Sequence, residues 1–308
     1  MVSVGSMLGV VFAAASIVGS TGDVWGFLFS LAAITSTNLG LGVPLGVSLG
    51  LVGAAAAVFG DSDSDSDSDA DTDGRELRTM LRYASMALAL GLFGLVIGAI
   101  FATAVLLLLG SQSVVSLVAA TVLNEFGLAI AALWFVTSTD RGLSYFDVRV
   151  PDPRELKYAV GGVVAIFGLL VVLSTVSNAL GLPSSQNSIV QVASGNPYGL
   201  LVLVPLSWLV IGPGEELLYR NVVQKYLYGG FSRTGAVLVA CVVFTLMHVP
   251  AYYTPNSLAM LDTLVSLFFL SLILGVAYER TNNVVVTILI HGTFDAVQFA
   301  ALFLTLKP

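Results

Sequence analysis

Two adjacent glutamates and an arginine lie in a stretch that is otherwise apolar enough to cross a membrane, residues 212–220 with the sequence GPGEELLYR. An ionised side chain at the centre of a bilayer costs about 2.5–3.5 kcal/mol on insertion scales, so these three groups require compensation. Glu216 and Arg220 are four residues apart, which places them on one helix face and predicts an ion pair. Glu215 is rotated by about 100° from Glu216. It is therefore the carboxylate that is left free for chemistry.

The Gly-Pro-Gly that precedes the glutamates favours a helix start or a kink. Proline is well tolerated at the first helical position, where its missing N–H is not needed. We therefore expect Pro213 to occupy that position, and we expect the new helix N-terminus to stabilise nearby anions. A structural Glu–Arg clamp without catalytic function is the alternative interpretation of this stretch.

The chain contains two histidines, and each lies in a further apolar stretch. His248 ends the run FTLMH, with Phe244 one helical turn earlier. His291 opens the run HGTFD, with Asp295 one turn later. A carboxylate at this spacing can orient a histidine that binds a metal. Each histidine could equally be a packing residue, or part of an ordinary helix pair.

Taken together, these residues predict one buried site that is assembled by three separate helices. Neutral imidazoles and carboxylates are typical zinc ligands, and a glutamate beside a metal-bound water is a common general base. The pattern differs from H-E-x-x-H, in which a single helix carries both histidines. Tertiary packing must therefore bring these residues together.

The composition identifies an integral membrane protein. Hydrophobic residues make up 56% of the 308-residue chain and charged residues only 10%, with a mean hydropathy of +0.93, whereas soluble domains are about 25% charged. The net charge is −7, and no basic patch suggests nucleic-acid binding. We predict an all-α, polytopic transmembrane bundle with seven spans after residue 75, near 83–109, 112–137, 158–181, 199–223, 235–250, 259–279 and 284–306.

The part of the chain before these spans falls into two regions. Residues 1–60 are apolar and are expected to contain one to three further spans. Residues 61–74, DSDSDSDSDADTDG, are acidic and of low complexity, which predicts a disordered linker. Residues 75–308 then form the membrane domain, with the chemically distinctive motifs in residues 158–308.

Loop charges predict the orientation of the domain in the cell membrane. The loops at 138–157 and 224–234 and the turn at 280–283 contain lysine or arginine, whereas the loops at 110–111, 182–198 and 251–258 contain neither. Positively charged loops favour the cytoplasmic side. We therefore expect the basic loops to be cytoplasmic and the C-terminus to be outside.

The three motifs resemble those of the CPBP family of intramembrane metalloproteases. They are E-E-x-x-x-R at 215–220, F-x-x-x-H at 244–248 and H-x-x-x-D at 291–295, in the family's order and on successive membrane helices. The family includes type II CAAX prenyl endopeptidases and bacteriocin-processing, Abi-like proteins. The resemblance covers residues 158–308. Asn221 stands where members often have glycine, and Asp295 where many have asparagine, which leaves the substrate preference open.

The resemblance implies that the protein hydrolyses a peptide bond of a membrane-embedded or lipid-anchored substrate. Glu215 would be the general base and would activate water together with His248. His291 and Asp295 would position a metal or stabilise the oxyanion. The supporting residues would be Glu216, Arg220 and Phe244. If a zinc ion is bound, its ligands would be Glu215, His248 and His291, and exchanged roles for the two glutamates remain possible.

Two other functions are consistent with the sequence. A non-catalytic scaffold or immunity-type protein could share the fold, and an ion-coupled transporter could use the same buried acids and histidines. The sequence shows no internal repeat of the kind that many transporters have. Two further acids, Glu125 and Asp262, also lie in predicted spans. We expect Glu125 to pair with another polar group or to line the cavity, and Asp262 to be solvated near the outer interface.

Overall fold

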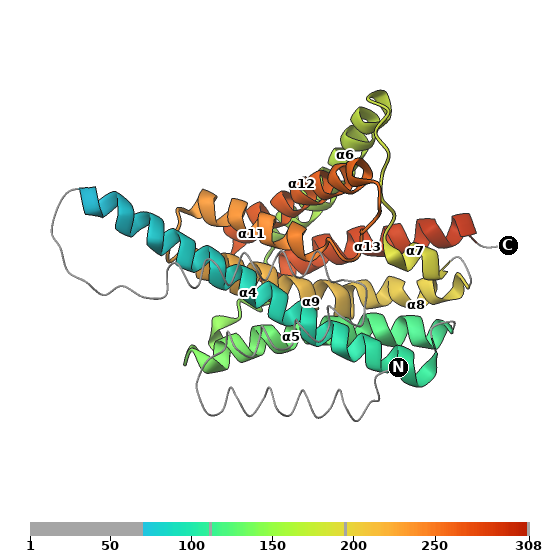
Figure 1. Cartoon of the computed structure of the whole chain (residues 1–308), viewed down its shortest axis with the longest axis horizontal. Helices are drawn as coiled ribbons and strands as arrows, with labels where there is room; N and C mark the ends of the chain where they lie inside the picture. The colour runs from blue at the N-terminus through green and yellow to red at the C-terminus, as the bar shows by residue number, and fades with distance from the viewer. Residues whose placement is uncertain (1–69, 111–112, 194–195, 307–308) are drawn as a thin grey trace. The chain divides into compact units, whose positions relative to one another are not determined.

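The computed structural model describes residues 70–110, 113–193 and 196–306 (Figure 1). The chain divides into two compact units, Met1–Ser85 and Met86–Pro308, and the second unit contains all three motifs. Within the described residues the regular structure is entirely helical, which confirms the predicted fold class. The spans predicted in residues 1–60 and residues 61–69 of the predicted linker lie outside the described residues.

The described helices follow one another along the chain with short connections. They are α4 (Ala70–Leu109), α5 (Val114–Ser138), η1 (Leu143–Tyr145), α6 (Pro153–Ala179), α7 (Ser188–Ala193), α8 (Tyr198–Leu206), η2 (Ser207–Ile211), α9 (Gly212–Glu216), η3 (Leu217–Gln224), α10 (Lys225–Leu227), α11 (Arg233–Met247), α12 (Ser257–Thr281) and α13 (Val284–Leu306).

Six helical segments in the described residues are long and apolar enough to cross a membrane. They are Arg75–Leu109, Val114–Ser138, Pro153–Ala179, Tyr198–Leu227, Ser257–Thr281 and Val284–Leu306. The seventh predicted span, at 235–250, corresponds to α11, which has only 15 residues. About 20 residues are needed to cross the hydrocarbon core, so α11 is short for a span. The other six segments are sufficient to make the protein a multi-pass membrane protein.

Local sequence signals explain several helix boundaries. Asp152 caps α6 through a capping box with Glu155, and Pro153 occupies the first turn, so α6 begins five residues earlier than we predicted from hydropathy. The α12 helix is capped by Asn256 and ends at Asn282, which adopts the left-handed conformation with φ 45°. The α4 helix begins at Ala70, so residues 70–74, which we assigned to the linker, are helical.

Of the two alternatives that we gave for Gly-Pro-Gly, a helix start or a kink, the start of a new helix is wrong. The helix continues from α8 through α9 to α10, and two π-helical segments, η2 and η3, flank α9. A π-helical turn carries an extra residue and shifts the hydrogen-bond register. The segment can therefore pass through Pro205 and Pro213 without ending. The two glutamates therefore lie within a continuous helical segment and not at its N-terminus.

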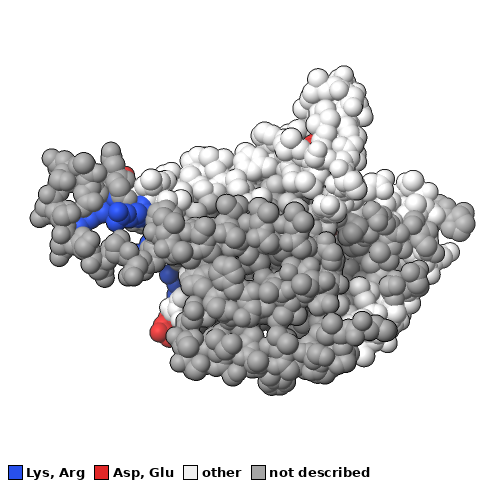
Figure 2. All heavy atoms as spheres, viewed as in Figure 1, with Lys and Arg blue, Asp and Glu red and all other residues white. Residues whose placement is uncertain are grey.

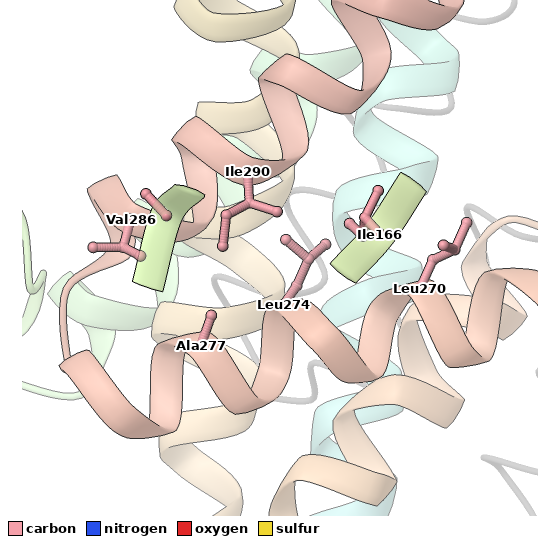
Figure 3. Close-up of a cluster of buried hydrophobic side chains, with 7 residues drawn as sticks. Ile166, Leu270, Leu274, Ala277, Val286 and Ile290 are labelled. Atoms are coloured by element: carbon pink, nitrogen blue, oxygen red, sulfur yellow. The ribbon is translucent and has the colours of Figure 1, made fainter. Parts of the chain in front are cut away.

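Helices α6, α12 and α13 share a hydrophobic core (Figure 3). Ile166 of α6 and Ile290 of α13 are at most 1% exposed, and they belong to one cluster with Leu270 and Leu274 of α12. Gly162 of α6 makes this approach possible, because a Cβ at that position would lie only 2.4 Å from Cδ1 of Ile290. This core holds the helix that carries His291.

Glycines bring the other helices into backbone contact. A Cβ on Gly127 of α5 would lie 2.2 Å from the backbone nitrogen of Gly98 in α4. A Cβ on Gly292 of α13 would lie 2.9 Å from the carbonyl oxygen of Ser207. Small residues allow this close approach, which drives much of helix association in membranes. The second contact fixes His291, the residue before Gly292, against the helix that carries the two glutamates.

The outer surface of the bundle is apolar, as expected of a surface that faces lipid. On the face in Figure 2, most described atoms belong to uncharged residues. Val160, Val164 and Val171 of α6 are each more than 60% exposed. Such exposure would be unfavourable in water and is favourable against lipid.

Candidate active site

Glu216 is the anchor of the candidate site. Its Oε2 lies 3.3 Å from Nε of Arg220, so the ion pair predicted from the four-residue spacing is present. Its Oε1 accepts a hydrogen bond from Nδ1 of His291 at 2.9 Å. Neither Glu216 nor Arg220 is exposed. A buried charge is tolerated when it is paired and hydrogen-bonded, and Glu216 meets both conditions.

Arg220 has two further partners on other helices. Its Nη2 donates a hydrogen bond to Oγ of Ser271 in α12 at 2.9 Å. Its guanidinium carbon lies 4.9 Å from the centre of the Phe244 ring in α11, which is within the range of a cation–π contact. We call the helical segment formed by α9 and η3, which carries both residues, the motif helix. The Glu216–Arg220 pair therefore connects the motif helix to α11, α12 and α13.

Glu215 faces both histidines. Its Oε2 lies 3.6 Å from Nε2 of His248 and 3.8 Å from Nε2 of His291. These separations are too long for direct hydrogen bonds. Oε2 is buried and has no hydrogen-bond partner among the described residues. A buried carboxylate oxygen between two imidazoles is thus left available for another molecule.

The backbone and the Phe244 ring fix the orientation of His248. Its Nδ1 lies 2.8 Å from the carbonyl oxygen of Phe244, and the two ring centres are 4.2 Å apart. Because Nδ1 faces the backbone, Nε2 faces Glu215. Phe244 also makes edge contacts with Tyr219 at 5.2 Å and with His291 at 6.2 Å between ring centres. It is the aromatic support that the two histidines share.

Asp295 completes the group of residues that we singled out in the sequence. Its Oδ2 lies 3.6 Å from Nε2 of His291. The side chains of Glu215, His248 and Asp295 are 12%, 17% and 18% exposed. The cluster is therefore mostly buried, but part of each of these side chains is accessible. The structure therefore brings Glu215, His248, His291 and Asp295 together on one side, with Glu216 behind them.

A match to a known family bears on what this cluster does. Residues 197–297 match the family described as type II CAAX prenyl endopeptidase Rce1-like. All three motifs lie within these residues. The chain carries an Rce1-like domain. No curated protein and no solved structure showed a significant match to the chain. The matched residues begin just before α8 and end within α13, so α4, α5 and α6 lie outside the match.

The structure of the Rce1-like domain shows what Asn221 contacts at the position where family members often have glycine. Asn221, which follows Arg220, is fully buried. Its Nδ2 donates to the hydroxyl of Tyr278 at 2.9 Å and to Asp147 at 3.2 Å. Lys225 donates to the same Asp147 carboxylate at 2.9 Å. Asn221 therefore belongs to a polar network that attaches the loop after α5 to the motif helix and α12.

The predicted zinc ion finds no matching arrangement in the Rce1-like domain. In the part of the chain that the structure describes, no group of three or more His, Cys, Asp or Glu side chains is arranged to hold one metal ion. Nδ1 of His291 contacts Glu216, which leaves Nε2 of that ring facing Glu215 and Asp295. The donor types suit zinc, but the arrangement does not, and no step of the mechanism below depends on a metal.

The two additional acids have local partners. Asp262 accepts a hydrogen bond from Ser177 of α6 at 2.6 Å, so it is not merely solvated. Oε1 of Glu125 accepts from Asn124 at 3.2 Å, whereas its Oε2 has no partner among the described residues. A Cβ on Gly214 would lie 2.9 Å from that oxygen. Glu125 therefore packs directly against the motif helix, one residue before Glu215.

Sequence reasoning missed Tyr252, which lies beside the cluster in the turn after α11. Its ring centre is 6.5 Å from that of His248. A signal existed, because Tyr252 is four residues after His248 and the helical turn continues that far. Its backbone nitrogen donates to the His248 carbonyl oxygen at 3.2 Å.

Proposed function

We propose that this protein is an intramembrane endopeptidase in which Glu215 and His248 activate the attacking water. The observation that carries the proposal is the unpartnered Oε2 of Glu215, which faces Nε2 of His248 across 3.6 Å. A water molecule can bridge two polar groups at such a separation. The match to the Rce1-like family supports peptide-bond hydrolysis as the reaction.

The proposed reaction proceeds in two steps. Glu215 takes a proton from the bound water while the water oxygen attacks the carbonyl carbon of the peptide, and the carbonyl oxygen becomes an oxyanion. When the C–N bond breaks, the proton passes from Glu215 to the leaving nitrogen, which departs as an amine. The other product is a carboxylic acid. His248 holds the water during the attack.

The remaining cluster residues have supporting roles in this proposal. Nε2 of His291 faces Glu215 and Asp295. When Nε2 carries a hydrogen, it would donate a hydrogen bond that stabilises the oxyanion. Glu216 and Arg220 hold the three helices in register, and Phe244 supports both imidazoles. Because the cluster lies in membrane-spanning segments, the substrate must reach it from the membrane or its surface. A lipid-anchored or membrane-embedded peptide meets this requirement.

The test is cleavage of peptides by the purified protein in liposomes. Three probes are compared: a fluorogenic prenylated CAAX-type peptide, the same peptide without its lipid, and a transmembrane peptide. We expect the wild type to cleave at least one lipid-bearing or transmembrane probe. We expect Glu215→Gln to lose at least about 10²-fold of that activity, because a general base contributes about 10²–10⁴-fold, and to unfold at an unchanged temperature.

Glu76→Gln is the matched control, because it removes an exposed carboxylate far from the motifs in sequence. It should cleave like the wild type. Equal cleavage by wild type and Glu215→Gln, or no cleavage of any probe, would contradict the proposal. Those results would favour the scaffold or transporter alternatives, since neither requires a free carboxylate facing a bound water.

A further inference from the structure

The candidate site is rich in hydrogen-bond acceptors and poor in donors. Glu215, Glu216 and Asp295 are carboxylates, which accept hydrogen bonds and do not donate them when ionised. The proposed reaction builds negative charge on the carbonyl oxygen of the substrate, and donors aimed at that oxygen are usually the largest single contribution to the rate. His291 can supply one such donor. A second would have to come from a neutral side chain close to the cluster.

Tyr252 is placed to supply it. It lies in the turn that follows His248, with the two ring planes tilted by 30°. The phenol is close enough to interact electrostatically with the carboxylates of Asp295 and Glu215. Only part of the Tyr252 side chain is exposed to solvent. The tyrosine therefore lies beside His248, one of the reacting groups that we propose.

Contacts with two other segments hold Tyr252 in place. The hydroxyl of Ser185 donates to the backbone carbonyl oxygen of Tyr252 at 2.5 Å, and the backbone nitrogen of Ser185 donates to the hydroxyl of Thr263 at 2.9 Å. The side chain of Asn187, which accepts a hydrogen bond from the backbone nitrogen of Ile189 at 2.9 Å, lies in the same segment. The segment between α6 and α7 and the start of α12 thus hold the backbone of Tyr252 in place.

The protonation state of Tyr252 suits a donor. Burial raises the pKa of its phenol above the ordinary value of about 10, and the negative charges of Asp295 and Glu215 act in the same direction. The amide of Asn187 lowers the pKa in part. The phenol therefore keeps its hydrogen at neutral pH.

We propose that Tyr252 is a further catalytic residue whose hydroxyl donates a hydrogen bond to the oxyanion of the peptide substrate, alongside His291. This inference rests on the proposed endopeptidase function. It assigns a role to a residue outside the three motifs. It also assigns a positioning role to Ser185, which holds the backbone of Tyr252.

The first test is Tyr252→Phe, which removes the hydroxyl and keeps the ring. Loss of one oxyanion donor costs about 10²–10³-fold in kcat in well-studied hydrolases. We expect kcat for the best probe peptide to fall at least about tenfold while KM changes less than about threefold. Tyr253→Phe is the matched control, because Tyr253 is the next residue and is 58% exposed. Its kcat should equal that of the wild type.

The second test is rescue by a new donor. Asp295→Asn replaces an acceptor with an amide that can donate, without changing the size of the side chain. In the Asp295→Asn background, Tyr252→Phe should therefore cost less than about threefold in kcat, clearly less than in the wild-type background. A purely structural tyrosine would cost the same in both backgrounds.

The outcomes separate this inference from the proposed function. Cleavage that depends on Glu215 but has the same kcat in Tyr252→Phe as in the wild type overturns the role of Tyr252 alone. A loss in Tyr252→Phe that comes with a lower unfolding temperature and is not reduced by Asp295→Asn also overturns it. Cleavage that does not depend on Glu215 overturns the proposed function and this inference with it.

Discussion

Glu216 accepts a hydrogen bond from Nδ1 of His291 at 2.9 Å while its other carboxylate oxygen lies 3.3 Å from Nε of Arg220. One fully buried carboxylate therefore joins α13 to the motif helix and neutralises an arginine in the same span. Its neighbour Glu215 has an oxygen without a hydrogen-bond partner in the described residues, and that oxygen lies between the two imidazoles. Adjacent residues of the same type thus have environments that suit different roles.

Glu216→Ala should destabilise the fold, whereas Glu215→Gln should not. Removing one partner of a buried ion pair leaves the other charge unpaired and costs about 3–5 kcal/mol. We expect the unfolding temperature in detergent to fall by many degrees in Glu216→Ala and to stay within a degree or two of the wild type in Glu215→Gln. Similar unfolding temperatures for the two variants would show that the glutamates do not divide their roles in this way.

Phe244→Leu should reduce kcat more than it reduces stability. The ring packs 4.2 Å from His248 and 6.2 Å from His291 between ring centres, and aromatic contacts contribute about 0.5–1.5 kcal/mol each. Loss of that orientation corresponds to about a two- to tenfold fall in kcat. Phe269→Leu, which changes a phenylalanine that is 40% exposed, is the control and should cleave normally. An unchanged kcat in Phe244→Leu would mean that the backbone alone orients His248.

Gly127→Ala should destabilise the bundle strongly. The added methyl group would lie 2.2 Å from the backbone nitrogen of Gly98 and 2.4 Å from its Cα, so the α4 and α5 backbones must separate. We expect a loss of at least about 1–3 kcal/mol, as in other overpacked cores, measured by thermal unfolding in detergent.

Gly161→Ala provides the comparison for this substitution. Gly161 also lies within a membrane-spanning helix, but a Cβ there would meet nothing within 4 Å. Alanine has the higher helix propensity, so this variant should be as stable as the wild type or slightly more stable. Equal destabilisation by both substitutions would indicate a helix-wide effect and not a contact at Gly98.

Removal of metal should leave peptide cleavage intact. In the described residues, no three potential ligands are arranged around one point, and Glu215 with His248 can activate water directly in the mechanism we propose. We therefore expect cleavage to survive prolonged chelation. The metal content of purified protein should also be the same in wild type, His248→Ala and His291→Ala. About one zinc per chain that is lost in both variants, with activity restored by zinc, would contradict this expectation.

The sequence by itself determined that the chain is a multi-pass membrane protein and that Glu216 and Arg220 share a helix face. The long apolar runs can be stable only as membrane helices, since every backbone polar group must be satisfied within the segment. The four-residue spacing of Glu216 and Arg220 fixes a shared helix face, whatever surrounds it. These are local or compositional properties, and the described spans and the ion pair agree with them.

Only the tertiary structure decided which side chains meet. The distances from Glu215 to His248 and His291 depend on how three helices pack, and that packing depends on glycines such as Gly292 that the sequence did not mark as special. The Gly-Pro-Gly before the glutamates was misread because a proline can be accommodated by π-helical turns as well as by a helix start. Tyr252 was missed because its position depends on Ser185, more than sixty residues earlier in the chain. Local spacing sets the face of a helix, but contacts between distant segments build a site.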